Sequence, residues 1–222
     1  MDDFHSDKKK LLNTVKQFSL INFLFTGSRC LIKKYIISEM KRSKNKCFTF
    51  LDIGSGGGDI VFWLEKICRK NFLKVKIYCL DYDKRIIEYL KRCIRKRKLK
   101  NIKIVFDSVF NLEKIGKFDF IFANHFLHHF DNNDIIKIVK KIYSSTKKIF
   151  IINDLSRSKI IYFFYLLFAF FFLWKSFAFT DGLISIKKGF LMEEVKTAVK
   201  KISSQIKIKR MNPGRIYLFC KK

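Results

Sequence analysis

Short apolar segments alternate with longer helical segments along most of this chain, and this alternation limits the possible folds more than any other feature. The apolar segments lie near residues 48–53, 75–80, 102–106, 118–123 and 148–153. The segments that repeat apolar residues every three to four positions, with lysine or arginine opposite, lie near 59–69, 84–96 and 133–145. Such alternation is typical of βαβ units, in which helices cover both faces of a parallel sheet.

Two more short strands are expected near the end of the chain, at 205–210 and 215–220. Pro213 and Gly214 lie between them, and a Pro-Gly pair suits a tight turn. We therefore predict an α/β fold with a doubly wound, mostly parallel seven-stranded sheet that ends in an antiparallel hairpin.

The sequence also suggests how the chain is divided. Residues 1–46 are expected to form a helical flank or lid, with two amphipathic helices broken near Gly27. Residues 47–222 would form the main domain. An apolar helical insertion is expected within it, at about 159–190.

A glycine-rich loop, residues 54–58, joins the first expected strand to the first expected helix. Glycine has no Cβ, so the backbone there can pass close to a nucleotide-like ligand. Asp52 and Asp59 flank the loop and would oppose a pyrophosphate at the helix N-terminus. They suit a cationic ligand such as S-adenosylmethionine (SAM), which carries a sulfonium and an ammonium group.

An acidic residue, Asp81, stands at the end of the second expected strand, about 20 residues beyond the glycine loop. A carboxylate at that place can accept hydrogen bonds from both hydroxyls of a ribose. Together, loop and carboxylate predict a site for a nucleoside-containing cofactor.

The order of the segments LDIGSGGGD, CLDYD, VFDSVF and FDFIFANHFLHHF resembles class I SAM-dependent methyltransferases over residues 48–155. The segments NDLSRS at 153–158 and DGLIS at 181–185 resemble small bacterial enzymes related to the ubiquinone and menaquinone methyltransferases. The resemblance implies a Rossmann-like methyltransferase fold with SAM as cofactor. The candidate cofactor-binding residues are Asp52, Gly54, Ser55, Gly56, Asp81, Tyr82, Asp107, Ser108 and Asn124.

The resemblance also implies individual roles. Asp107 would meet the adenine amino group, and Asn124 would line the methionine end of the cofactor. Ser55 stands where the family usually has cysteine, a change that should leave the backbone contacts of the loop intact.

Candidates for a catalytic base follow the fourth expected strand, because ligands bind at the carboxyl ends of strands in this fold. We favour His128 over His125 and His129, with packing at a helix start as the alternative. Asp154 and Arg157 follow the fifth strand and would face the rim of the site. A capping aspartate and a solvated arginine would explain them equally well.

Residues 160–174 form an apolar run, which is short for a transmembrane helix. A spanning helix would also separate the last two strands from their sheet. We expect instead the roof of an acceptor pocket or a helix in the membrane interface, with burial in the core as the alternative.

The net charge of +28 has three readings: surface lysine that reflects biased composition, attraction to anionic membranes, or binding of nucleic acid. The six cysteines form no CxxC pair, so no metal is expected. The start of the chain is not that of a signal peptide, so a cytoplasmic location is expected, with contact at the inner face of the membrane left open.

These observations predict a SAM-dependent O- or C-methyltransferase for a lipophilic small molecule, such as a phenol or quinone precursor. Residues 124–127 lack the Asn/Asp-Pro-Pro-aromatic motif of enzymes that methylate base amino groups. An RNA methyltransferase that uses the basic surface and a non-catalytic SAM-binding membrane protein remain as alternatives.

Overall fold

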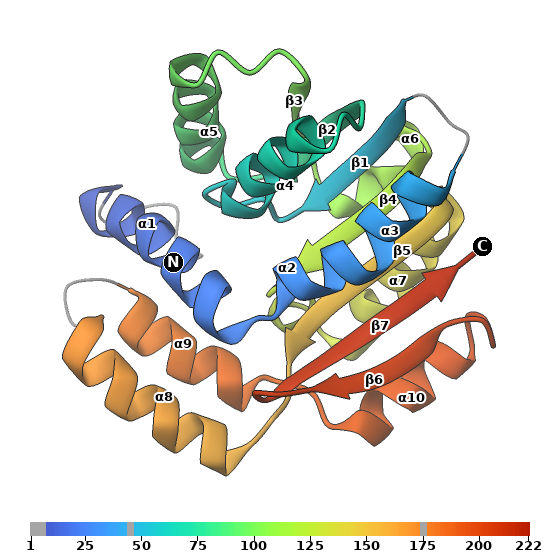
Figure 1. Cartoon of the computed structure of the whole chain (residues 1–222). Helices are drawn as coiled ribbons and strands as arrows, with labels where there is room; N and C mark the ends of the chain where they lie inside the picture. The colour runs from blue at the N-terminus through green and yellow to red at the C-terminus, as the bar shows by residue number, and fades with distance from the viewer. Residues whose placement is uncertain (1–7, 44–46, 174–176) are drawn as a thin grey trace.

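The computed structural model describes residues 8–43, 47–173 and 177–222. The strands in these ranges are β1 (Phe48–Ile53), β2 (Val75–Asp81), β3 (Ile102–Phe106), β4 (Phe118–Asn124), β5 (Thr146–Leu155), β6 (Lys207–Met211) and β7 (Arg215–Lys221). They form one sheet in the order β3-β2-β1-β4-β5-β7-β6 (Figure 1). The first five strands are parallel, and β7 is antiparallel to β5 and β6. The predicted mostly parallel sheet with an antiparallel hairpin is therefore confirmed.

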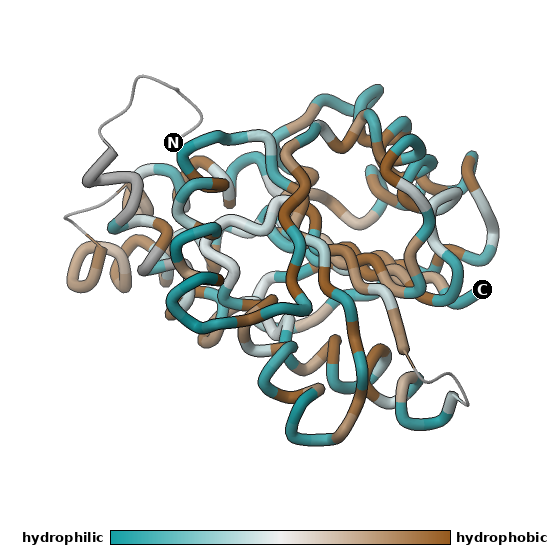
Figure 2. Tube along the Cα trace, turned by 90° about the horizontal axis from the view of Figure 1, so that it is seen from above, coloured by the Kyte–Doolittle hydropathy of each residue, from teal (hydrophilic) through white to brown (hydrophobic). Residues whose placement is uncertain are grey.

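The central strands are apolar because both of their faces are covered. Phe50, Phe120 and Phe150, on β1, β4 and β5, have no exposed surface. A parallel strand that is buried on both sides needs a continuous rather than an alternating apolar sequence. Figure 2 shows these hydrophobic stretches in the interior and hydrophilic residues toward the periphery.

Two sets of helices cover the sheet, each with its own apolar core. The first set is α2 (Ser28–Leu31), η1 (Ile32–Ile37), α3 (Ser38–Arg42), α4 (Asp59–Lys70) and α5 (Lys84–Lys96). The second set is η2 (Val109–Asn111), α6 (Leu112–Ile115), η3 (Leu127–His129), α7 (Asn132–Ser145) and α10 (Met192–Lys200). Periodic apolar residues such as Leu64 on α4 and Ile138 on α7 face the sheet and are fully buried.

Three helices lie beyond the carboxyl ends of the parallel strands: α1 (Lys8–Phe25), α8 (Lys159–Phe172) and α9 (Ala178–Lys187) (Figure 1). A small apolar cluster of Ile21, Ala169, Leu173 and Ala178 joins them. The alternative prediction that the apolar run is buried in the core is wrong, because one face of α8 is exposed. Among the described residues, no helix has the length and apolar character needed to cross a membrane.

Candidate active site

The glycine loop forms a tight passage between β1 and α4. Gly54 and Gly58 have φ angles of 67° and 73°, which other residues rarely adopt. A Cβ at Gly54 would come within 2.7 Å of the Phe126 ring, so the loop lies directly beside the segment that follows β4. A Cβ at Gly56 would have no atom nearer than 4.0 Å, so this part of the loop faces open space. The loop can therefore cradle a ligand at Gly56.

Three carboxylates surround this cradle. Burial raises the pKa of Asp52 well above its ordinary value, and the nearby Asp59 and Asp81 raise it further. Burial also raises the pKa of Asp59 and of Asp81. The Asp59 Oδ2 atom is buried and has no hydrogen-bond partner among the described residues. A bound cation would relieve this concentration of buried negative charge, so the site fits the sulfonium of SAM.

Two backbone amides, one of them in the glycine loop, fix the position of the Asp81 carboxylate. Its Oδ2 accepts a hydrogen bond from the Gly56 backbone at 3.2 Å, and its Oδ1 accepts one from Asp83 at 3.1 Å. The backbone N–H of Asp107 donates to the backbone oxygen of Asp81 at 3.3 Å. The ends of β2 and β3 thus bring two of the sequence-predicted cofactor residues together, with Tyr82 exposed beside them.

Asp107 and Ser108 form a local turn at the open end of β3. The Asp107 carboxylate accepts hydrogen bonds from the Ser108 backbone at 2.7 Å and from Asn111 at 2.8 Å. The bond from Asn111 is the main reason why its pKa is lowered, so this carboxylate is ionised. Ser108 in turn caps η2 by accepting from Phe110. Ser55 is buried, and its hydroxyl donates to the Asp52 backbone at 2.9 Å.

Helix α1 closes over the glycine loop through a residue that sequence reasoning missed. The Asn22 amide donates to Asp59 Oδ1 at 3.0 Å, and its oxygen accepts from Asn124 at 3.0 Å. Val15, on the same helix, packs against Gly57. The available signal was a single polar residue within the apolar stretch LINFLF.

Asn124 is the centre of a polar cluster at the ends of β4 and β5. Its Oδ1 accepts hydrogen bonds from Ser28 at 2.8 Å, from Asn153 at 2.9 Å and from Arg215 at 3.2 Å. Arg215 is 2% exposed, and burial lowers its pKa to about 10. The Arg215 side chain remains charged. Through Asn124, it connects β7 to the segments that carry Ser28 and Asn153.

His125 belongs to this polar cluster and is unsuited to collect a proton. Its Nε2 lies 3.0 Å from the Arg215 guanidinium, and its φ angle is 53°. Burial, and then the charge of Arg215, lower the pKa of His125 well below its ordinary value. The ring is therefore neutral and accepts from Arg215.

His128 and Asp154 form a buried pair. The His128 Nδ1 lies 2.6 Å from Asp154 Oδ1, and the His128 Nε2 lies 3.1 Å from the Ser185 hydroxyl on α9. Asp154 Oδ2 also accepts from the backbone of 126–128. Burial acts to raise the pKa of Asp154, but His128 and Arg215 outweigh it and the pKa is lowered. The carboxylate is therefore ionised, and its contact with Nδ1 orients the His128 ring so that Nε2 faces Ser185.

Asp154 both caps the turn after β4 and orients His128, so the two sequence interpretations of this residue are compatible. Arg157 does not join the pair. Its Nε donates to the Gly189 backbone at 3.0 Å, and it lies 3.4 Å from Glu194. Ser185 belongs to the DGLIS segment, and no local sequence pattern indicates its contact with His128.

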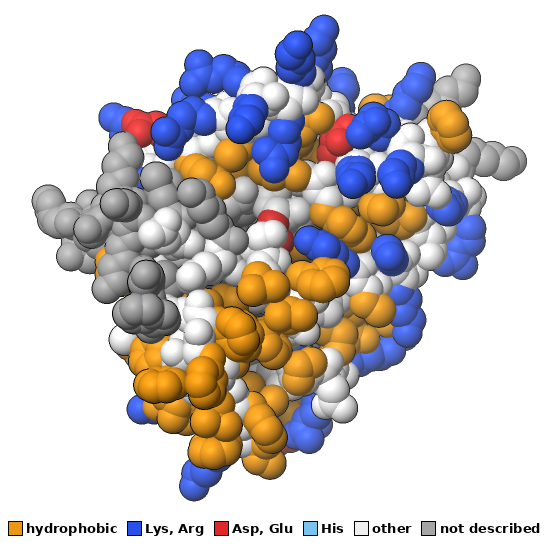
Figure 3. Space-filling view, turned by 60° about the vertical axis from the view of Figure 1, so that its left-hand side comes forward, with side chains coloured by type: hydrophobic (Ala, Val, Ile, Leu, Met, Phe, Trp, Pro, Cys, Tyr) orange, Lys and Arg blue, Asp and Glu red, His pale blue; other side chains and the backbone are white. Residues whose placement is uncertain are grey.

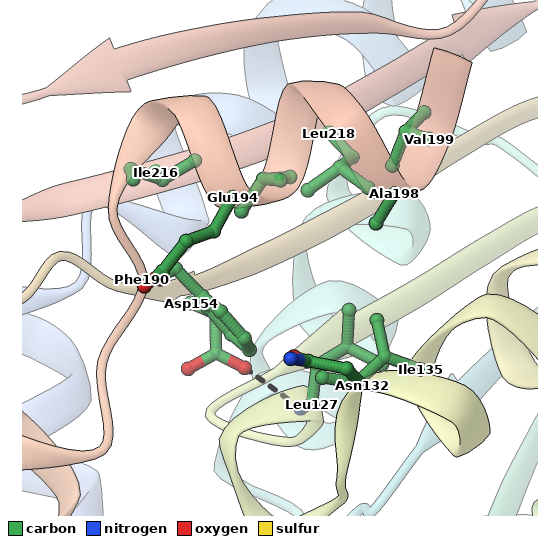
Figure 4. A pocket seen from close by; sticks show the side chains of 11 residues that line it. Leu127, Asn132, Ile135, Asp154, Phe190, Glu194, Ala198, Val199, Ile216 and Leu218 are labelled. Atoms are coloured by element: carbon green, nitrogen blue, oxygen red, sulfur yellow. Dashed lines mark hydrogen bonds between the residues drawn. The ribbon is translucent and has the colours of Figure 1, made fainter. Parts of the chain in front are cut away.

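A groove of about 530 Å³ opens beside His128. Its lining includes His129, Phe130, Arg157, Lys187 and Lys188. A much smaller cavity of about 20 Å³ lies behind Asp154, between α7 and α10 and against β7 (Figure 4). The smaller cavity has room for about one water molecule, whereas the groove has room for an organic acceptor.

A model of a methyltransferase domain family matches residues 44–178. The chain belongs to this family. The predicted membership among SAM-dependent methyltransferases is thereby confirmed, and enzymes of this family use SAM as methyl donor. A comparison of the sequence with curated proteins finds no match. In the described part of this methyltransferase, no group of three or more His, Cys, Asp or Glu side chains could hold a metal ion.

Solved structures share the fold of this methyltransferase. One is a SAM-dependent methyltransferase from Aquifex aeolicus, 16% identical, covering 96% of this chain and 97% of that chain with a TM-score of 0.62. Another, from Methanococcus maripaludis, is a candidate SAM-dependent methyltransferase that is 20% identical, with coverages of 100% and 95% and a TM-score of 0.65. A third is magnesium protoporphyrin IX methyltransferase from Synechocystis with bound S-adenosylhomocysteine (SAH), 10% identical, with coverages of 87% and 82% and a TM-score of 0.59.

Proposed function

We propose that this methyltransferase moves the methyl group of SAM to an oxygen or carbon atom of a lipophilic small molecule, such as a phenol or quinone precursor. The observation that carries the proposal is the buried His128–Asp154 pair at the mouth of a groove of about 530 Å³. When bound, SAM supplies an electrophilic methyl group on a positively charged sulfur.

The glycine loop and its carboxylates hold the cofactor in this proposal. Gly54, Ser55 and Gly56 offer backbone contacts, and Asp52 balances positive charge. Asp81, with Tyr82 beside it, receives the ribose hydroxyls. The half-buried pair Asp107 and Ser108 receives the adenine, and Asn124 lines the methionine end.

His128 acts as the general base for a hydroxyl acceptor. Asp154 holds the proton on Nδ1 and stabilises the imidazolium that forms when Nε2 takes a proton. Ser185 occupies the place on Nε2 that the acceptor hydroxyl takes, or passes the proton from it. The closeness of Gly54 and Phe126 brings the loop after β4 next to the cofactor cradle.

Most side chains that line the groove are polar or charged, and the support for a lipophilic acceptor is the apolar helix α8 that adjoins it. Lys187 lines the groove and lies 5.2 Å from the ring of Tyr162 on the apolar helix α8. The structurally similar Synechocystis enzyme is named as a methyltransferase of magnesium protoporphyrin IX. We place the protein in the cytoplasm, working at the inner face of the membrane, where such molecules dissolve.

The decisive experiment is a methyl-transfer assay with labelled SAM, offering a lipid extract and total RNA as separate acceptors. We expect label in an organic-soluble product, with a rate that changes little between low and high salt. Label in RNA alone, with a steep salt dependence, would assign the basic surface to RNA methylation. SAM binding by calorimetry without transfer to either acceptor would leave a non-catalytic SAM-binding protein.

A further inference from the structure

The outer face of α8 is apolar although it faces solvent. Seven large residues on this helix are between 45% and 69% exposed: Ile160, Phe163, Phe164, Leu167, Phe170, Phe171 and Phe172. A helix at the surface of a water-soluble protein normally places polar residues on this side. Figure 3 shows hydrophobic side chains gathered over the lower part of the molecule, where α8 and α9 lie.

The packing of α8 explains why this face is left uncovered. The opposite face is already occupied, because Ala169 is buried and the Tyr165 hydroxyl donates to the Ala178 backbone at 2.7 Å. Phe168 packs edge-on against Phe25 of α1 at 4.9 Å between ring centroids. The outer face therefore cannot turn inward without breaking the contacts that hold α8, α9 and α1 together.

Helix α1, which packs against α8 through Phe25 and Phe168, also carries exposed apolar residues. Leu20, Phe23 and Leu24 of α1 are each at least 45% exposed. Contiguous apolar patches of more than a few hundred Å² are rare on monomeric proteins and mark sites of association with a partner or a membrane. We call the seven exposed residues of α8, with these three of α1, the apolar face.

Positively charged side chains lie at the ends of the apolar face and favour an anionic partner. Lys159 begins α8, Lys187 and Lys188 end the α8–α9 pair, and all three side chains are exposed. The Arg29 guanidinium lies 5.1 Å from the Phe23 ring. Apolar side chains beside basic ones match a bilayer surface with acyl chains beneath anionic headgroups. A second copy of a chain with a net charge of +28 would bring like charges together.

We infer that the apolar face docks this protein on an anionic lipid bilayer, with α8 lying in the plane of the interface. The helix has 14 residues and is about 21 Å long, against about 30 Å for a hydrocarbon core, so it lies along the surface. Docking places the groove beside the bilayer, because Lys187 contacts both the groove and α8. The inference rests on the proposed function only for its purpose, the delivery of a lipophilic acceptor to His128.

Vesicle flotation tests the docking without any methyl transfer. The full chain is mixed with phosphatidylcholine vesicles, with or without phosphatidylglycerol, and with neither SAM nor acceptor. We expect flotation with the anionic vesicles, reduced but not abolished by high salt. The double variant Phe163→Glu/Phe170→Glu should bind about tenfold or more weakly, because both charges enter the interface.

Phe72→Glu is the matched control, since Phe72 is 95% exposed but lies in the turn before β2, far along the chain from α8. It should float like the wild type. Unchanged SAM affinity and melting temperature would show that the double variant is folded. Equal flotation of wild type and double variant, or none of either, would overturn the inference. A wild-type dimer that the double variant abolishes, without flotation, would assign the face to a second copy. None of these outcomes depends on whether methyl transfer occurs.

Discussion

The His128 Nδ1 lies 2.6 Å from the Asp154 Oδ1, and each side chain is 2% exposed. The two residues come from the ends of neighbouring strands, β4 and β5, which are paired in register up to Asn124 and Asn153. Burial strengthens the charge-assisted hydrogen bond between them and fixes the ring orientation. The geometry leaves one imidazole nitrogen, Nε2, for chemistry.

Replacing His128 by glutamine should lower kcat about 100-fold for a hydroxyl acceptor, because the proton acceptor is lost. SAM affinity should stay within about threefold of the wild-type value, since the cofactor cradle is untouched. Steady-state kinetics and calorimetry measure the two quantities. His129→Gln is the comparison variant: His129 is exposed and lines the groove, so its replacement should change the KM for the acceptor more than kcat. An unchanged kcat in His128→Gln would remove the base from the mechanism.

Asp154→Asn should destabilise the fold by about 3 kcal/mol near neutral pH, because it removes a buried charge-assisted hydrogen bond and leaves an amide facing backbone N–H donors. The folded state lowers the pKa of Asp154 below its ordinary 3.8. The stability that the carboxylate contributes is therefore present above that pH and is lost as the pH falls below it. Urea unfolding of both proteins should show a difference that shrinks in acid. A constant difference would contradict this account.

Asp81→Asn should weaken SAM binding about tenfold or more, because one strong acceptor for the ribose hydroxyls is lost. Asp83→Asn is a close control. Asp83 caps α5 by accepting from Arg85, and asparagine caps helices equally well. Isothermal calorimetry should therefore give a large change for Asp81→Asn and a small one for Asp83→Asn. Similar losses in both variants would point to a general effect on the loop.

Asp52→Asn should stabilise the ligand-free protein while weakening SAM binding. The folded state raises the pKa of Asp52, so ionised Asp52 costs stability as the pH rises through that raised value. The variant avoids this loss and should melt a few degrees higher at neutral pH. Its affinity for the cationic cofactor should fall, because a balancing charge is gone. Thermal scans with and without SAM measure both effects. A lower melting temperature without SAM would refute the electrostatic argument.

Asn22→Ala should speed SAM release, because Asn22 links Asp59, at the start of α4 beside the glycine loop, to Asn124 on β4. We expect about a tenfold rise in the dissociation rate, from the loss of two hydrogen bonds that close α1 over the cradle. Stopped-flow displacement measures it. Ser19→Ala, an exposed position on the same helix, should leave the rate unchanged. Equal rates in both variants would mean that α1 does not retain the cofactor.

The sequence alone predicted the strands well because their signal is local. The expected strands at 48–53 and 102–106 coincide with β1 and β3, and the expected helix at 84–96 coincides with α5. Each of these elements carries its own apolar pattern within a few residues. The glycine loop was recognised for the same reason, since its conformation depends on the residues within it.

The parts of the site that the sequence did not predict are those formed by long-range contacts. Asn22 and Arg215 reach Asn124 across 102 and 91 residues, and no local pattern marks such a pair. Ser185 meets His128 because α8 and α9 fold back toward β4. Arg157 lines the groove, as its position after β5 suggested, but its pairing with Glu194 on α10 could not be read from the local sequence.

The polar cluster around Asn124 has a consequence for biosynthesis. The Asn124 side-chain oxygen accepts hydrogen bonds from Ser28, which lies near the start of the chain, and from Arg215, which lies on the last strand. During translation, 91 further residues must be synthesised after Asn124 before its hydrogen bond with Arg215 can form. A chain that stops before β7 lacks the charge that ties α2, β4 and β5 together, and β5 is left as an open sheet edge. Premature products would therefore be targets for degradation or aggregation before they could compete for the methyl donor.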